Sequence, residues 1–149
     1  MIRLERIHLL SRADKLLPLR QFVRELAAKQ GCCEENLDCM VMAINEACMN
    51  VMQHAYHGKD DGEIVIEFWK DANELVVRIY DYAEKVDLDT IKSRNLSDVR
   101  PGGLGVHIIH QVMDSVEYVN QPDVSGNMLE MRKQLNKPAV CDMQKINKN

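Results

Sequence analysis

The 149-residue sequence has no apolar run near the roughly 20 residues that a membrane-spanning helix needs. Its first residues include the acidic Glu5 and no continuous apolar segment, so we expect no signal peptide. Lysine and arginine do not cluster, and the formal net charge is −4, which gives no support for binding to a nucleic-acid backbone. These absences predict a cytoplasmic protein of one domain that binds neither membranes nor nucleic acid directly.

The five cysteines form no C-x-x-C pair, and their number is odd. Both facts argue against a disulfide framework and against a zinc site. Cys39 and Cys48 fall within a helical pattern, where we expect them to be small core side chains. Cys32 and Cys33 are adjacent at an expected turn, and their role stays open.

Several common catalytic and nucleotide-binding patterns are also missing. The glycine-rich run at 101–105 lacks the lysine of a Walker A loop, and no strand leads into it with Rossmann spacing. His54, His57, His107 and His110 are scattered among expected helices and show no metal-ligand spacing. No Ser/His/Asp or Cys/His nucleophile arrangement is supported.

The hydrophobic period of the sequence changes from helical to alternating after Tyr56. The expected elements are, in chain order, a strand at 2–9, a helix ending at Gly31, a helix at 34–56, strands at 64–69 and 75–80 joined by a hairpin turn, a helix at 103–113, and strands at 116–119 and 128–135. The pattern predicts an α+β fold of two layers, with helices on one face of a mixed, mainly antiparallel sheet. We expect the domain to span residues 1–136 and residues 137–149 to form a flexible tail.

Glu46, Asn50 and His54 recur every four positions along the second expected helix. At roughly 100° per residue they form a continuous polar edge beside the apolar stripe that contains Ile44. A carboxylate and an amide on one helix edge can supply a general base and an oxygen ligand for magnesium. A lone Glu-x-x-x-Asn pattern is more often a solvated face, so this alternative stays open.

Asp81 continues the inward alternation of Leu75, Val77 and Ile79. An unpaired carboxylate in a core is costly, so either the strand breaks before Asp81 or the carboxylate has a dedicated partner. The exocyclic amine of adenine is a suitable partner, because it donates where a carboxylate accepts. The alternative is a turn aspartate at the end of the strand.

Glycines at 102, 103 and 105 precede an apolar helical pattern that begins at Val106. They therefore mark a helix N-terminus, where backbone N–H groups can approach an anion closely. A lone G-G-x-G run is often just a loop, so this alternative stays open. The preceding residues 83–101 are polar and irregular. A segment of this length without regular structure is more often functional than not.

Taken in order, these motifs resemble the GHKL (Bergerat-fold) ATPase superfamily, and most closely its bacterial branch of anti-sigma-factor serine/threonine protein kinases. Residues 46–56 are similar to the N box, and residues 101–118 are similar to the G2 box and the strand after it. The resemblance extends to about Leu135. It implies a two-layer Bergerat sandwich that binds ATP and Mg²⁺, phosphorylates an anti-anti-sigma (STAS-type) protein and sequesters a sigma factor. It also leads us to expect a homodimer.

The resemblance also implies a role for each matching residue. Glu46 is the general base, Asn50 ligates magnesium, and Asp81 receives the adenine amine. The backbone at 102–105 lines the phosphates, and residues 83–101 form an ATP lid. The implied nucleotide-binding set is Asn50, His54, Asp81, Ala83, Gly102, Gly103, Leu104, Gly105 and Val106.

Ala83 and Lys85 stand where the D-x-G-x-G box of the family has its glycines. This departure keeps a second interpretation open, in which the chain is a partner-binding module of the same fold with weak ATP binding or no kinase activity. A third interpretation is the ATP-binding domain of a histidine kinase. It is opposed by the lack of a dimerisation helix with a phosphoacceptor histidine.

Overall fold

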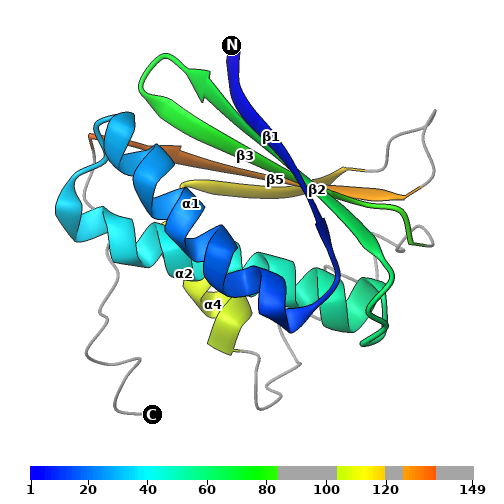
Figure 1. Cartoon of the computed structure of the whole chain (residues 1–149). Coiled ribbons are helices and arrows are strands. Elements are labelled where there is room, and N and C mark those ends of the chain that lie inside the picture. The colour runs from blue at the N-terminus through cyan, green and yellow to red at the C-terminus, as the bar shows by residue number, and fades with distance from the viewer. Residues whose placement is uncertain (84–103, 120–125, 137–149) are drawn as a thin grey trace.

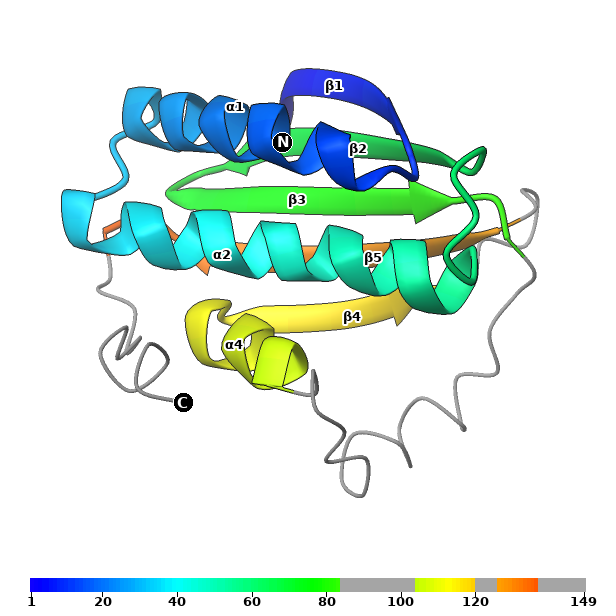
Figure 2. The same ribbon diagram turned by 60° about the horizontal axis from the view of Figure 1, so that its bottom comes forward.

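The structure, a computed structural model, describes residues 1–83, 104–119 and 126–136. In these segments five strands form one sheet, β1 (Ile2–Leu10), β2 (Glu63–Asp71), β3 (Glu74–Asp81), β4 (Ser115–Val119) and β5 (Asn127–Gln134), in the order β1-β2-β3-β5-β4. One face is covered by the helices α1 (Leu16–Lys29), α2 (Glu34–Asn50) and α4 (Leu104–Val112) (Figures 1 and 2). No helix in the described segments is long and apolar enough to cross a membrane.

The predicted α+β class and the helical layer on one side of the sheet are confirmed. A mixed sheet was expected, but every neighbouring pair of described strands is antiparallel. Each predicted helix and strand is found, with small shifts of its bounds. The tail expected at 137–149 lies outside the described residues, as do residues 84–103 and 120–125.

The core lies between the sheet and the helices. Apolar side chains at alternate positions of β2 and β3 point toward the helices, and these side chains form the sheet side of the core. Ile64, Ile66 and Phe68 are 0% exposed, and they belong to one apolar cluster with residues of all three helices. Ile66 lies opposite Ile79, and Phe68 lies opposite Val77, as the period of two predicts. Each such buried side chain contributes about 1.5–3 kcal/mol to stability. This burial fixes β3 and its last residue in place under the helices.

The central helix α2 packs against both α1 and α4 (Figure 2). Its regular α-helical part ends at Asn50, and the chain continues as a π turn, η2 (Val51–Ala55). In this turn the N–H of Tyr56 donates to the carbonyl oxygen of Val51 at 3.1 Å, five residues back. The helix predicted at 34–56 therefore has a wider last turn, a feature that is frequent at functional sites.

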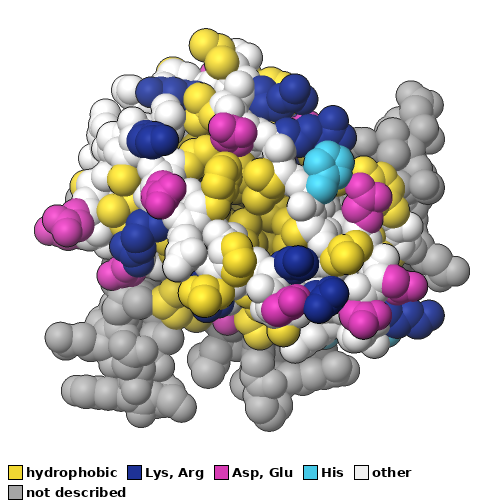
Figure 3. All heavy atoms as spheres, in the orientation of Figure 1, with side chains coloured by type: hydrophobic (Ala, Val, Ile, Leu, Met, Phe, Trp, Pro, Cys, Tyr) yellow, Lys and Arg dark blue, Asp and Glu magenta, His cyan; other side chains and the backbone are white. Residues whose placement is uncertain are grey.

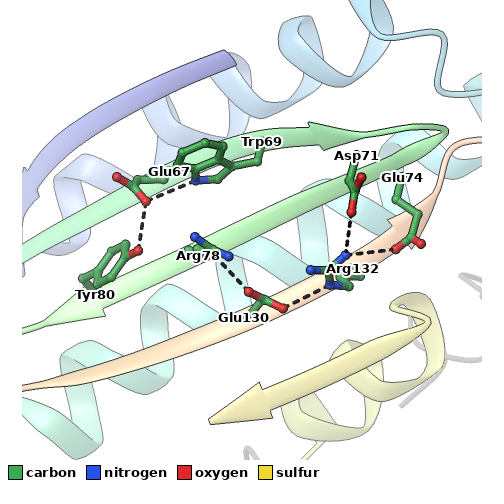
Figure 4. A network of polar contacts seen from close by, with 8 residues as sticks. All are labelled: Glu67, Trp69, Asp71, Glu74, Arg78, Tyr80, Glu130 and Arg132. Carbon is green, nitrogen blue, oxygen red and sulfur yellow. Dashed lines mark hydrogen bonds and ion pairs between the residues drawn. The ribbon is translucent and has the colours of Figure 1, made fainter. Parts of the chain in front are cut away.

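Charged and aromatic side chains lie on the other face of the sheet, opposite the helices (Figure 4). Glu67 is 8% exposed and accepts hydrogen bonds from the Tyr80 hydroxyl at 2.9 Å and the Trp69 indole at 3.1 Å. Glu130 of β5 pairs with Arg132 of the same strand at 3.0 Å and with Arg78 of the neighbouring strand β3 at 2.9 Å. These contacts pair opposite charges and satisfy buried polar groups on this face of the sheet.

Candidate functional site

The last two turns of α2 carry two of the predicted site residues. Glu46 and Asn50 are half-buried, one helical turn apart. Among the described residues, neither side chain has a hydrogen bond or ion pair to another side chain or to the backbone. Within the described segments no contact occupies these two polar groups, and the roles of base and metal ligand stay predictions.

Burial raises the pKa of Glu46 above the ordinary value of a glutamate. The cause is desolvation, which disfavours the charged form of a carboxylate. A carboxylate with a raised pKa is a stronger proton acceptor than one fully exposed to water. The electrostatics of Glu46 therefore suit proton transfer.

His54 does not share this environment. It lies in the π turn η2 and is exposed, whereas Glu46 and Asn50 are half-buried. Because a π turn holds more residues than an α-helical turn, the helical wheel does not apply beyond Asn50. The predicted polar edge therefore includes Glu46 and Asn50, and the structure does not extend it to His54.

Asp81 is the last residue of β3 and is 7% exposed, on the side of the sheet that faces the helices. Its Oδ1 accepts a hydrogen bond from Asn127 Nδ2 at 2.9 Å and another from the Ala83 N–H at 3.1 Å. Burial raises the pKa of Asp81, and these two donors oppose that shift. The inward direction predicted for Asp81 is confirmed, and the chain itself provides two of its partners.

Asn127 was missed by the sequence analysis, although a signal for it exists. It pairs with Asp81 across β3 and β5, just as Leu129 pairs with Ile79. An alternation carried back from the apolar Leu129 points Asn127 to the same face as Asp81. The observation that was lacking is the pairing of β5 with β3, which are far apart in the sequence.

Gly126 brings β5 against the end of β3. Its φ is +115°, and a Cβ at this position would overlap the carbonyl group of Asp81. Only glycine combines this backbone conformation with such a close approach. Gly126 and Asn127 together hold Asp81 from the β5 side.

Ala83 lies two residues after Asp81 and is half-buried. In the described segments the non-glycine residues with positive φ are His57 and Ala72, so Ala83 adopts an ordinary backbone conformation. Position 83 therefore does not require the positive φ that favours glycine. Lys85, the second departure from the glycine box, lies outside the described residues.

The predicted phosphate-binding run is described only in part. Gly102 and Gly103 lie outside the described residues, and Leu104, Gly105 and Val106 form the first turn of α4. The first N–H groups of a helix have no partner within it and carry a partial positive charge. Figure 2 shows the start of α4 on the side of the C-terminal half of α2, where Glu46 and Asn50 lie.

A magnesium ion fits this arrangement only with help from a bound nucleotide. Within the described part of the chain, no group of three or more His, Cys, Asp or Glu side chains could hold a metal ion. Magnesium in nucleotide sites is commonly bound by one or two protein oxygens together with phosphate oxygens. The amide oxygen of Asn50 is compatible with that mode of binding.

Comparison with known proteins gives consistent matches over most of the chain. Residues 9–133 match the family described as histidine kinase-like ATPase domain. The chain is 32% identical over 123 residues to the serine-protein kinase RsbW of Listeria monocytogenes serotype 4a (strain HCC23), a match covering 77% of this chain and 76% of the relative. It is 33% identical over 132 residues to the serine-protein kinase RsbW of Bacillus pumilus (strain SAFR-032), covering 82% and 80%.

A solved structure supports the fold independently. The crystal structure of the RsbU and RsbW domains of Rv1364c from Mycobacterium tuberculosis matches with a TM-score of 0.62 and 16% identity. The match covers 91% of this chain and 34% of the other. At this identity the likeness concerns the fold alone.

Proposed function

The chain belongs to the histidine kinase-like ATPase domain family, and from this membership we propose that it is an ATP-dependent protein serine/threonine kinase. Its likeness to two serine-protein kinases over about three-quarters of their length supports this activity. The observation that carries the proposal is Glu46, a half-buried carboxylate with a raised pKa, one turn before Asn50. The same likeness disfavours a binding module that has lost phosphotransfer.

In this mechanism Glu46 acts as the general base. Its carboxylate accepts the proton of a serine hydroxyl while the hydroxyl oxygen bonds to the γ-phosphorus. The bond from the γ-phosphorus to the bridging oxygen breaks, and ADP leaves. Catalysis of this reaction rests mainly on positioning and charge stabilisation, and a positioned base contributes a factor of about 10²–10⁴.

The remaining residues bind and orient the nucleotide. The Asp81 carboxylate accepts a hydrogen bond from the exocyclic amine of adenine, while Asn127 and Ala83 hold its Oδ1. The amide oxygen of Asn50 serves as a ligand for Mg²⁺, which neutralises phosphate charge when it is bound. The N–H groups at the start of α4 bind the phosphates, and residues 102–103 extend this site.

The partners follow from the same proposal. The acceptor is a STAS-type anti-anti-sigma protein, and the kinase sequesters a sigma factor when that partner is phosphorylated. Both partners act in the cytoplasm, and so does the chain. These assignments rest on the resemblance of residues 46–56 and 101–118 to the anti-sigma-factor kinase branch.

A homodimer is part of the proposal, with the surface of α1 and β1 as its interface. Figure 3 shows hydrophobic side chains gathered at the centre of this face. Leu4, Ile7 and Leu9 of β1 and Phe22 of α1 are only partly buried, and β1 is an edge strand. Ile2 is 71% exposed beside them. Sedimentation equilibrium of the purified chain tests this assignment.

The kinase and the binding module are separated by one experiment. The chain is incubated with ATP, Mg²⁺ and an anti-anti-sigma protein from the same genome, and intact-mass measurement detects phosphate on the partner. We expect phosphorylated serine or threonine on the partner. ADP binding and partner binding without any transfer would contradict the kinase assignment and support the binding module.

A further inference from the structure

The hydroxyl of Tyr56 joins three segments that are separate in sequence. It donates a hydrogen bond to the carbonyl oxygen of Glu63 at 2.5 Å and accepts one from the N–H of Tyr82 at 2.8 Å. Tyr56 directly follows the π turn at the end of α2, Glu63 begins β2, and Tyr82 directly follows β3. A phenol offers one donor and can accept, so both capacities of this group are used.

The N–H of Tyr82 has no place in the ladder of the sheet. The pairing of β2 with β3 ends at Ile64 and Asp81, one residue earlier. A backbone N–H at this point requires a partner from elsewhere. The Tyr56 hydroxyl supplies it, and the peptide that links Asp81 to Tyr82 is thereby tied to the residue after the π turn.

The ring of Tyr56 occupies space that a side chain at residue 62 would fill. A Cβ at Gly62 would lie 2.5 Å from both Cγ and Cδ2 of Tyr56. Gly62 is buried, and its carbonyl oxygen accepts a hydrogen bond from the N–H of Ser11 at 2.7 Å. The glycine therefore leaves space for the ring within a fixed stretch of backbone.

We infer that Tyr56 is a positioning residue for nucleotide binding, an inference that rests on the proposed function. Tyr56 directly follows the π turn that extends α2 beyond Asn50. Its hydroxyl binds the N–H of Tyr82, the residue next to Asp81. It therefore sets the position of the group that binds the base relative to the groups that act on the phosphates. Asn127 holds Asp81 from β5, and Tyr56 holds the same segment from α2.

A purely structural role makes a different prediction from a positioning role. Loss of a hydroxyl that only stabilises the fold lowers the melting temperature and leaves the affinity for nucleotide unchanged. Loss of a hydroxyl that positions Asp81 weakens nucleotide binding in a protein that is still folded. Because the phosphate-side residues stay in place, the KM for ATP should rise while kcat stays close to its original value.

The test compares Tyr56→Phe with Tyr80→Phe. Tyr80 lies on the other face of β3, and its hydroxyl donates to Glu67 at 2.9 Å, so each variant loses only a hydroxyl. In Tyr56→Phe we expect the Kd for ADP and the KM for ATP to rise roughly fivefold to tenfold, the change that corresponds to about one hydrogen bond. The Tyr82 amide should also exchange faster with solvent. Tyr80→Phe should keep the original affinity.

A second variant addresses the case in which Tyr56→Phe does not fold. Gly62→Ala displaces the ring and retains the hydroxyl, so it should weaken ADP binding in the same direction. Unchanged ADP affinity in folded Tyr56→Phe, or an equal loss in Tyr80→Phe, would overturn the inference. Failure of the unaltered chain to bind ADP would instead contradict the proposed function itself.

Discussion

Replacing Asp81 with asparagine tests the assignment of the base-binding residue. The substitution keeps the size of the side chain and an oxygen that can accept the bonds from Asn127 and Ala83. It replaces the other carboxylate oxygen with an amide nitrogen, which donates and cannot accept. A donor would then face the exocyclic amine of adenine, which is also a donor. We therefore expect weaker nucleotide binding without loss of the fold.

The expected magnitude follows from the loss of a hydrogen bond to a buried charged group. Such a loss is worth about 1–3 kcal/mol, which corresponds to a roughly 5- to 150-fold increase in the Kd for ADP. The stability of the nucleotide-free protein at neutral pH should not fall. Burial raises the pKa of Asp81, so its ionised form opposes folding above that pKa, and asparagine removes this charge.

Isothermal titration calorimetry with ADP and Mg²⁺ measures the affinity, and thermal unfolding reports the stability. Asp71→Asn is a matched control, because Asp71 lies at the hairpin end of β2 and binds Arg132 at 3.3 Å on the opposite face of the sheet. The control should bind ADP as the original chain does. Unchanged ADP affinity in folded Asp81→Asn would refute the reasoning and remove Asp81 from the site.

Three further substitutions test the site. At pH values above the pKa of Glu46 in the folded protein, Glu46→Gln should raise the melting temperature, because burial raises that pKa and the charged carboxylate opposes folding. This gain should vanish below about pH 4, where the glutamate is protonated in both the folded and the unfolded state. Asn50→Ala should abolish the difference in ADP affinity between magnesium and EDTA, and a persisting difference would exclude Asn50 as the metal ligand. Gly126→Ala should destabilise the fold by about 1–3 kcal/mol in urea unfolding and weaken ADP binding, because the methyl group meets the Asp81 carbonyl at a strained φ.

The sequence predicts the parts of this fold that depend on local periodicity. The alternation of Ile64, Ile66 and Phe68 specifies a half-buried strand, and the register of the hairpin follows from the short turn. The inward direction of Asp81 is a consequence of the same alternation. Glu46 and Asn50 could be placed on one helix edge because α2 is regular up to Asn50.

Features that depend on contacts between distant segments could not be predicted in this way. The partnership of Asn127 with Asp81 requires that β5 lies beside β3, which no local pattern specifies. The π turn after Asn50 changes the position of His54, because a helical wheel assumes a constant number of residues per turn. The bridge made by Tyr56 depends on the π turn and joins its end to the start of β2 and to the residue after β3, a contact between distant segments that no local pattern specifies.

The central claim is that Glu46 accepts the proton of the attacking hydroxyl, and a single-turnover measurement tests it most directly. The rate of phosphate transfer to the partner protein is measured with saturating ATP and Mg²⁺ for the original chain and for Glu46→Gln. We predict a rate lower by about 10²–10⁴-fold in Glu46→Gln, with the affinity for ADP unchanged. An undiminished rate in Glu46→Gln would contradict the account, because the hydroxyl would then need no base at this position.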